Sequence, residues 1–147
     1  MANTTRGIRF FSEDITLRLK NKAQLRDWFI ATAQAEGARI KELNYIFCSD
    51  AYLLEINQSY LNHDTYTDII TFDNSEIEGR VVGDIFISID RVRENAQSFA
   101  VSENDELHRV MIHGLLHLLG YADKSKTEKA KMTEKENYYL ALRLFVA

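Results

Sequence analysis

The segment 102–123 constrains the fold most strongly, because it predicts a helix that must be buried on two sides. One stripe of the helix is apolar at helical spacing, and its last turns are apolar on the opposite side as well. The first stripe contains Leu107, Val110, Met111, Leu115 and Leu118, and the opposite side contains Ile112, Leu116 and Leu119. Ser102 and Asp105 have the spacing of a capping box at its start. We therefore expect this to be the central helix of the protein.

The same helix carries His113 and His117, and Asp123 follows its end. Residues four apart in a helix lie about 6 Å apart along the axis on one face, so both imidazoles can bind one ion. Gly120 can adopt a left-handed conformation, end the helix and let Asp123 approach the same point. Histidines at this spacing also occur as packing or surface residues, but two unpaired histidines in an apolar setting would be costly. We therefore predict a three-ligand Zn²⁺ site with a position open for water.

The ligand spacing is also that of the metzincin protease motif H-E-x-x-H-x-x-G-x-x-H. Two positions differ from that motif: Gly114 stands where the protease has its general-base Glu, and Asp123 replaces the third His. Without the Glu, the usual proton acceptor for peptide hydrolysis is missing. A metalloprotease is therefore the less favoured interpretation.

The length of 147 residues fits one domain, 1–147, which buries roughly two-thirds of its unfolded surface. Apolar runs fall short of the roughly 18 to 20 residues that a membrane helix needs, and the first residues lack the apolar region of a signal peptide. The single Cys48 cannot form an internal disulfide and lies in an apolar run, which predicts a small buried residue. These features together favour a cytoplasmic protein without a membrane span.

The net charge of −4 argues weakly against a nucleic-acid partner, but the charge is unevenly distributed. The middle of the chain, 42–123, holds four Lys or Arg against fifteen Asp or Glu, which suits cation binding near the ligand motif. Both ends of the chain are basic and could hold a polyanion if they fold onto one face. The alternative is that these charges are solvated helix faces.

The periodicity of the whole chain predicts an α+β fold, with a small mixed sheet of about four strands packed with about five helices. The expected strands are 8–11, 15–19, 43–48, 67–72 and 81–89, the last two forming a hairpin. Gly83 marks a place where another backbone or a ligand comes close. The other helices are expected from an N-cap at Asn21 to a stop at Gly37, from Ser49 through Tyr60, over 91–100, and over 128–145. The last should bury Met132, Tyr139, Leu142 and Phe145.

Three segments from Ile56 onward, about half of the chain, resemble the YbeY family, metal-dependent endoribonucleases of ribosomal RNA maturation. The first, Asn57-x-x-Tyr60 followed by Thr67-Asp-Ile-Ile-Thr-Phe72, is similar to N-x-x-Y-R and T-D-V-L-S-F. The second, Gly83-Asp-Ile-Phe-Ile-Ser88, is similar to G-D-I-x-I-S. The third, 113–123, is similar to H-G-x-L-H-L-x-G-Y-D-H and is the most specific.

The resemblance implies a single YbeY-like metallohydrolase domain and a single-strand-specific endoribonuclease. Its substrate would be single-stranded RNA of the small ribosomal subunit, in 16S rRNA 3′-end maturation and ribosome quality control. One Zn²⁺ or another transition metal, held by His113, His117 and Asp123, would activate a water for attack on a phosphodiester. The alternative is a non-catalytic, metal-stabilised ribosome-assembly factor.

Three departures from the family pattern bear on the site and its surroundings. Asp123 occupies the third ligand position, which is normally His, and makes the site harder and more anionic. Tyr66 replaces the usual Pro. Leu61 stands where the family usually has an Arg that contacts the RNA or assists catalysis, and an aliphatic side chain cannot stabilise phosphorane charge. Either another basic residue substitutes for that Arg or the activity is altered.

Two further carboxylates have open interpretations. Asp84 could orient a ligand histidine as an outer acceptor or cap a loop. Asp68 could hold its strand at the cleft or accept a proton, and we favour the structural role, which leaves it a weak catalytic candidate. The remaining histidines, His63 in a loop and His108 on another face of the central helix, are expected to have no role in the site.

Overall fold

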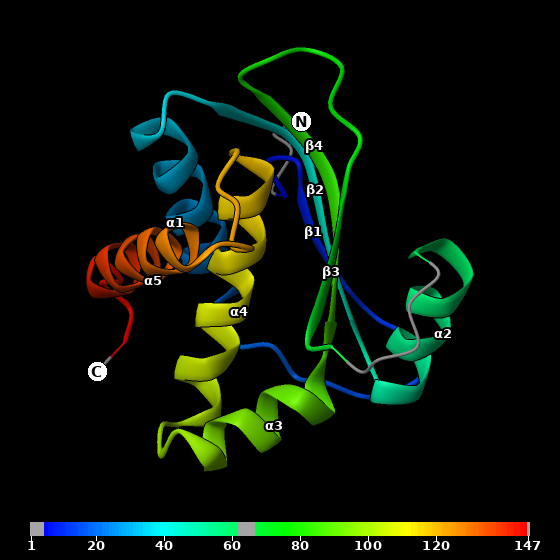
Figure 1. Cartoon of the computed structure of the whole chain (residues 1–147). Helices are drawn as coiled ribbons and strands as arrows, with labels where there is room; N and C mark the ends of the chain where they lie inside the picture. The colour runs from blue at the N-terminus through cyan, green and yellow to red at the C-terminus, as the bar shows by residue number, and fades with distance from the viewer. Residues whose placement is uncertain (1–4, 62–66, 147) are drawn as a thin grey trace.

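The computed structural model describes residues 5–61 and 67–146, and these form a mixed sheet with helices on both faces (Figure 1). The strand order is β1-β2-β4-β3. The strands are β1 (Ile8–Ser12), β2 (Arg39–Cys48), β3 (Ile69–Asp73) and β4 (Arg80–Ser88). The first, second and fourth are parallel, and β3 is antiparallel to β4 as the predicted hairpin requires. The α+β class is confirmed.

The helices are α1 (Lys22–Ala35), α2 (Asp50–Leu61), α3 (Ile89–Ser98), α4 (Glu103–Leu118) and α5 (Lys126–Ala141). Helices α1, α4 and α5 lie on one side of the sheet, and α2 lies on the other (Figure 1). Helix α4 contacts β3 and β4 on one side and α1, α3 and α5 on the others. Met111, Ile112, Leu115 and Leu116 are fully buried, so α4 is the central helix that the apolar pattern predicted.

Side chains alternate between the two faces of β4, as the period of a strand requires. Ile85 and Ile87 pack into the main core with α4, whereas Phe86 packs on the opposite face beside Leu53 of α2. Gly83 is confirmed as a place of close approach. A Cβ there would lie 2.8 Å from Leu118 Cδ1 and 2.8 Å from the Phe72 carbonyl oxygen.

The strand predicted at 15–19 is wrong, because this segment crosses from β1 to α1 without pairing with the sheet. Ile15, Leu17 and Leu19 alternate inward and pack against the core, so the pattern correctly indicated an extended, half-buried chain. Sheet pairing also needs a partner strand. The chain leaves the sheet after the Glu13 N–H donates to the Phe47 carbonyl at 2.9 Å.

The helix starts follow the predicted caps with one exception. Ser49 Oγ accepts a hydrogen bond from the Tyr52 N–H, and Ser102 Oγ accepts one from the Asp105 N–H. Asn21 occupies the N-cap of α1, but its φ of 62° is left-handed and its side chain makes no capping bond.

The C-terminal helix begins at Lys126, before the predicted start at 128, and ends at Ala141, before the predicted end at 145. A capping box of Ser125 with Glu128 begins α5, and the helix ends at Ala141. Met132 and Tyr139 are buried as expected. The prediction for Leu142 is wrong: it caps the end of α5 and is 51% exposed.

Three other predictions concern single residues or short segments. Cys48 is fully buried, as predicted. Each helix in the described part of the chain is too short or too polar to span a lipid bilayer. His63 and Tyr66 lie outside the described residues.

Candidate metal centre

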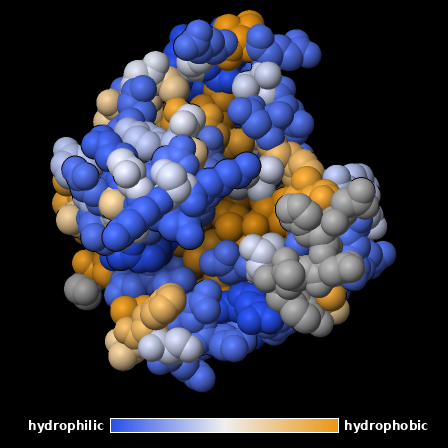
Figure 2. Space-filling model, viewed as in Figure 1, coloured by the Kyte–Doolittle hydropathy of each residue, from blue (hydrophilic) through white to orange (hydrophobic). Residues whose placement is uncertain are grey.

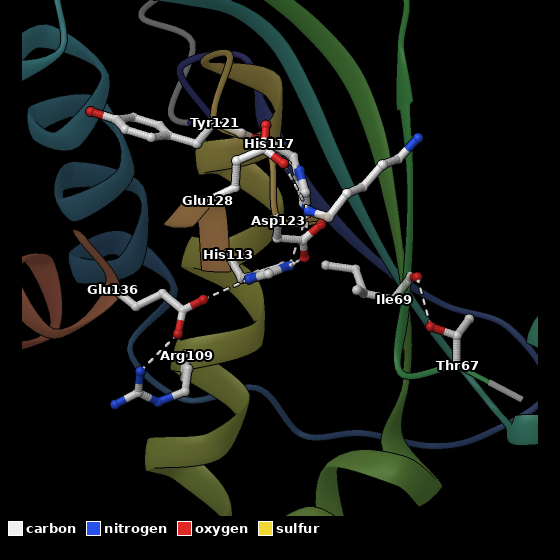
Figure 3. A network of polar contacts seen from close by, with 10 residues as sticks. Thr67, Ile69, Arg109, His113, His117, Tyr121, Asp123, Glu128 and Glu136 are labelled. Atoms are coloured by element: carbon white, nitrogen blue, oxygen red, sulfur yellow. Dashed lines mark hydrogen bonds and ion pairs between the residues drawn. The ribbon is translucent and has the colours of Figure 1, made fainter. Parts of the chain in front are cut away.

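The three predicted ligands converge on one point. His113 and His117 lie one turn apart on α4, with their Nε2 atoms 3.0 Å apart. Gly120 has a φ of 106°, and the reversed chain after it brings Asp123 Oδ2 to 3.2 Å from His113 Nε2 and 3.3 Å from His117 Nε2. Figure 3 shows the two rings and the carboxylate pointing toward one another. The ligand atoms all lie within 4.8 Å of one another, so the set can hold one metal ion.

The other nitrogen of each imidazole has an acceptor of its own. His113 Nδ1 lies 2.6 Å from Glu136 Oε2, and His117 Nδ1 lies 2.9 Å from the Tyr121 carbonyl oxygen. A carboxylate and a carbonyl only accept hydrogen bonds, so each Nδ1 is the donor to its partner, and each Nε2 would offer its lone pair to an ion bound between the two rings and Asp123. Metal-binding histidines have this arrangement. Two imidazole nitrogens and one carboxylate therefore suit a divalent ion such as Zn²⁺.

Glu136 and Arg109 form an outer layer of the centre that the sequence analysis missed. Glu136 lies on α5 with a side chain 9% exposed, and its Oε1 accepts a hydrogen bond from Arg109 Nη1 at 2.7 Å (Figure 3). Arg109 Nη2 also donates to Asn137 Oδ1 at 2.7 Å. Arg109 precedes His113 by four residues, so their spacing placed them on one face. Glu136 offered no such signal, because it lies 23 residues from His113 on another helix.

The electrostatics of the centre favour a cation. Burial alone would lower the pKa of His113, but the hydrogen bond from its ring to Glu136 and the charges of Glu136, Asp123 and Asp68 outweigh it and raise that pKa. Burial also raises the pKa of the Asp68 carboxyl, against the opposing influence of His113. A group of carboxylates thus surrounds the ligand histidines, and an ion of positive charge would relieve their mutual repulsion.

The two carboxylates with open interpretations have different surroundings. Asp68 precedes β3, its carbonyl accepts the Ser88 N–H at 3.0 Å, and its carboxyl interacts with the charges of the metal centre. Asp84 accepts hydrogen bonds from Asn44 Nδ2 at 3.0 Å and Asn74 Nδ2 at 3.4 Å. Because Gly83 faces α4, Asp84 faces the other side of the sheet. Asp84 therefore ties strands and loop together, and the acceptor that orients a ligand histidine is Glu136.

His108 has a packing role, as expected. It is buried against Trp28 and Phe145, and its Nδ1 lies 2.7 Å from Arg143 Nη1. Burial first, and then the charge of Arg143, lower the pKa of His108 to about 4. It is therefore a neutral hydrogen-bond acceptor in the core near neutral pH.

Gly114 lies where α4 comes closest to the sheet. A Cβ at this position would lie 2.9 Å from both Ile69 Cδ1 and Ile85 Cγ2. The helix therefore has no space for a longer side chain here without moving away from the sheet. The close packing of α4 on Ile69 and Ile85 thus disfavours the general-base Glu of a metzincin protease at position 114.

The ligands are accessible from one side of the molecule. The side chains of His113, His117 and Asp123 are 20%, 24% and 36% exposed. Figure 2 shows this face hollowed, with an apolar floor, between the side that carries α4 and α5 and the side that carries α2. Ile69 of β3 lies beside the three ligands in Figure 3. The three ligands are therefore partly exposed to solvent on this face.

Comparisons with known proteins agree with these features. The family model described as Endoribonuclease YbeY matches residues 8–142. Two proteins named Endoribonuclease YbeY are similar to this chain. The one from Cytophaga hutchinsonii is 56% identical over 94% of this chain and 96% of its own length. The one from Parabacteroides distasonis is 47% identical over 92% of this chain and 95% of its own length.

A solved structure is similar as well. The solution structure of TM1509 from Thermotoga maritima has a TM-score of 0.63 and 30% identity to this chain, covering 90% of this chain and 86% of that one. The sequence relatives and this structure cover nearly the whole chain, including the segments around Asp68, Gly83 and the metal ligands. The chain belongs to the YbeY family.

Proposed function

We propose that this protein is a metal-dependent endoribonuclease that cuts single-stranded RNA in ribosomal RNA maturation. The observation that carries the proposal is the convergence of His113 Nε2, His117 Nε2 and Asp123 Oδ2, each imidazole being oriented through its Nδ1. Membership of a family whose relatives are named Endoribonuclease YbeY supports RNA as the substrate. The natural substrate would be the 3′ end of 16S rRNA in the small ribosomal subunit, as part of ribosome quality control.

The roles of the residues follow from their contacts. Zn²⁺ suits the ligand set, and such an ion supplies a lowered pKa for a water molecule and an electrophile for a phosphoryl oxygen. His113, His117 and Asp123 would bind it, and Glu136 and the Tyr121 carbonyl would hold the two rings. Asp68 is a weak candidate for proton exchange with the substrate: its carboxyl interacts with the charge of His113, and burial raises its pKa.

We also propose that residues 1–147 act as one domain in the cytoplasm. The relatives match this chain over nearly their whole length, which supports one functional unit. The buried free thiol of Cys48 fits a reducing compartment.

The test combines metal analysis with RNA cleavage. His113→Ala should abolish both the stoichiometric metal content and the cleavage of a structured RNA with a single-stranded tail. Glu134→Gln is a matched control, because Glu134 lies on α5 with a side chain 70% exposed and only a weak contact to Lys131 at 4.0 Å. Full cleavage by the His113 variant would refute the proposal.

Leu61 supports a second candidate, a non-catalytic ribosome-assembly factor braced by the metal. Leu61 ends α2 with 42% of its surface exposed, and its side chain offers no charge to a phosphate. This alternative predicts that a chelator lowers the melting temperature sharply while the purified protein leaves RNA intact with every divalent metal. A peptide-library digest with and without chelator would detect the less favoured protease activity.

A further inference from the structure

A partly buried carboxylate outside the metal centre joins three elements of the fold. Glu36 caps the end of α1, and its side chain is 14% exposed. Its Oε1 accepts a hydrogen bond from the Tyr121 hydroxyl at 2.6 Å, and its Oε2 accepts one from the Tyr139 hydroxyl. Lys135 Nζ lies 3.4 Å from the same Oε2. Glu36 thus links α1 to α5 and to the turn that follows α4.

Tyr121 connects this cluster to a metal ligand. Its carbonyl oxygen accepts the hydrogen bond from His117 Nδ1 at 2.9 Å, and its own N–H donates to the Leu116 carbonyl at 3.0 Å. In Figure 3 the Tyr121 ring points away from the three ligands. The residue is therefore held at two ends, with its hydroxyl on Glu36 and its carbonyl on His117.

Burial and hydrogen bonding have opposite effects on Glu36. Burial favours the neutral carboxyl, but the hydrogen bonds from Tyr121 and Tyr139 and the charge of Lys135 outweigh it, so the pKa of Glu36 is lowered. The carboxylate is therefore charged at neutral pH and makes charge-assisted hydrogen bonds, which are stronger than neutral ones. The cluster can hold the Tyr121 ring firmly.

We propose that Glu36 and Tyr121 are positioning residues for the metal centre, acting through His117. Glu36 fixes the Tyr121 side chain, and the fixed residue keeps its carbonyl in place as the acceptor of His117 Nδ1–H. This keeps the proton on Nδ1 and leaves Nε2 free to bind the ion. The inference rests on the proposed metal site, and it adds a contribution from α1, an element that contains no ligand.

The turn itself explains why such a brace matters. Gly120 is in the left-handed region and offers no side chain to pack, so the turn is held by its backbone hydrogen bonds to α4 and by the side-chain contacts of Tyr121. Asp123 follows Tyr121 by two residues on the same turn. A loosened Tyr121 would therefore disturb the acceptor of His117 and the approach of Asp123 together, whereas His113 would keep its own acceptor, Glu136.

The experiment compares Tyr121→Phe and Glu36→Gln with wild-type protein. The first removes one hydroxyl and leaves the backbone carbonyl, and the second removes the charge and keeps the shape. Tyr138→Phe is the matched control, because Tyr138 neighbours Tyr139 on α5, is 57% exposed and lies outside the Glu36 cluster. Zn²⁺ affinity is measured by chelator competition, the Co²⁺ absorption spectrum reports ligand geometry, and urea unfolding of the metal-free proteins reports stability.

Both variants should bind Zn²⁺ about tenfold more weakly than wild-type protein. This is the lower end of the loss of about 10- to 100-fold that is typical when a partner of a metal-binding histidine is changed, and we expect the lower end because the Tyr121 carbonyl itself remains. Their Co²⁺ spectra should change, and the Tyr138 control should match wild type. The double variant should bind Zn²⁺ no more weakly than the weaker-binding of the two single variants, because both changes break the same link between Glu36 and Tyr121. If Tyr121→Phe does not fold, Glu36→Gln decides by the same criterion.

Unchanged affinity and an unchanged Co²⁺ spectrum in these variants would overturn the inference, whatever happens to their stability, because the cluster would then only brace the fold. That result differs from failure of the proposed function. Wild-type protein that binds no metal would overturn the metal site and this inference together, whereas metal binding by the wild type with unaffected variants overturns this inference alone.

Discussion

Glu136→Gln should weaken metal binding while preserving the shape of the side chain. Glu136 accepts one hydrogen bond from His113 Nδ1 at 2.6 Å and one from Arg109 Nη1 at 2.7 Å. Glutamine has one acceptor oxygen and one donor amide, so one of these two partners must face an NH₂ group. If the amide faces His113, the imidazole proton must move to Nε2, the nitrogen that would bind the ion. If the amide faces Arg109, His113 keeps an acceptor, but a neutral one.

The size of the effect follows from these two arrangements. Loss of an acceptor behind a metal-binding histidine typically lowers metal affinity by about 10- to 100-fold, which corresponds to about 1.4 to 2.7 kcal/mol. Because the amide oxygen can still accept from His113, we expect the lower end, about tenfold. The metal-free protein should lose only about 1 kcal/mol, since Arg109 is 35% exposed and water can solvate its guanidinium.

The measurement is Zn²⁺ competition with a chromophoric chelator at a pH above the raised pKa of His113. Glu134→Gln removes a carboxylate from the same helix at an exposed position, so it controls for the change in net charge. Arg109→Gln should have a smaller effect than Glu136→Gln, because it leaves the carboxylate on His113 intact. Equal Zn²⁺ affinity in Glu136→Gln and wild-type protein would refute the role of Glu136 in orienting His113.

Three further predictions concern stability and ligand identity. Gly114→Ala should destabilise the protein by about 1 to 3 kcal/mol in urea unfolding, because its Cβ would lie 2.9 Å from side chains of β3 and β4; an unchanged midpoint would contradict this contact. The pKa of His108 is lowered to about 4 by burial and Arg143, so its stabilising contribution is complete above pH 6.5 and is lost as the pH falls toward 4. That contribution is about 3 kcal/mol. The free energy of unfolding, measured with urea at several pH values, should therefore depend less on pH in His108→Gln than in wild-type protein. The same pH dependence in both proteins would contradict the lowered pKa of His108. Asp123→Ala should lose stoichiometric metal in elemental analysis and Asp123→His should keep it, because imidazole can serve as the third ligand; full metal content in Asp123→Ala would exclude it as a ligand.

The part of the site that could be predicted from sequence is the part encoded by local spacing. His113 and His117 share a face because they are four residues apart on a helix, and Gly120 allows the turn that brings Asp123 back. The helix itself was predictable because its apolar residues cover two faces. In the same way, the patterns of 67–72 and 81–89 predicted the β3–β4 hairpin.

The errors arose where contacts between distant segments decide the structure. The segment 15–19 has the alternation of a strand, but the only strand beside β1 in the described sheet is β2, and the segment does not pair with either. Strand β2 begins at Arg39, earlier than the predicted 43, because β4 pairs with its exposed polar residues. Asp84 was a reasonable outer acceptor by composition, but the pleat of β4 turns it to the other face.

Helix α5 shows why the residues that support the metal ligands could not be predicted from the sequence. Its residues are mostly charged or polar, which is typical of a solvated helix, and few of them follow an apolar stripe. In the folded protein, Glu136 binds His113 directly, and Lys135 and Tyr139 hold the Glu36 carboxylate that supports Tyr121 and thereby His117. Both ligand histidines therefore depend on side chains of α5, one directly and one through α1. It follows that substitutions of Glu136, Lys135 or Tyr139 should change metal affinity even when the whole ligand segment 113–123 is intact, whereas exposed positions of α5 such as Glu134 and Tyr138 should not.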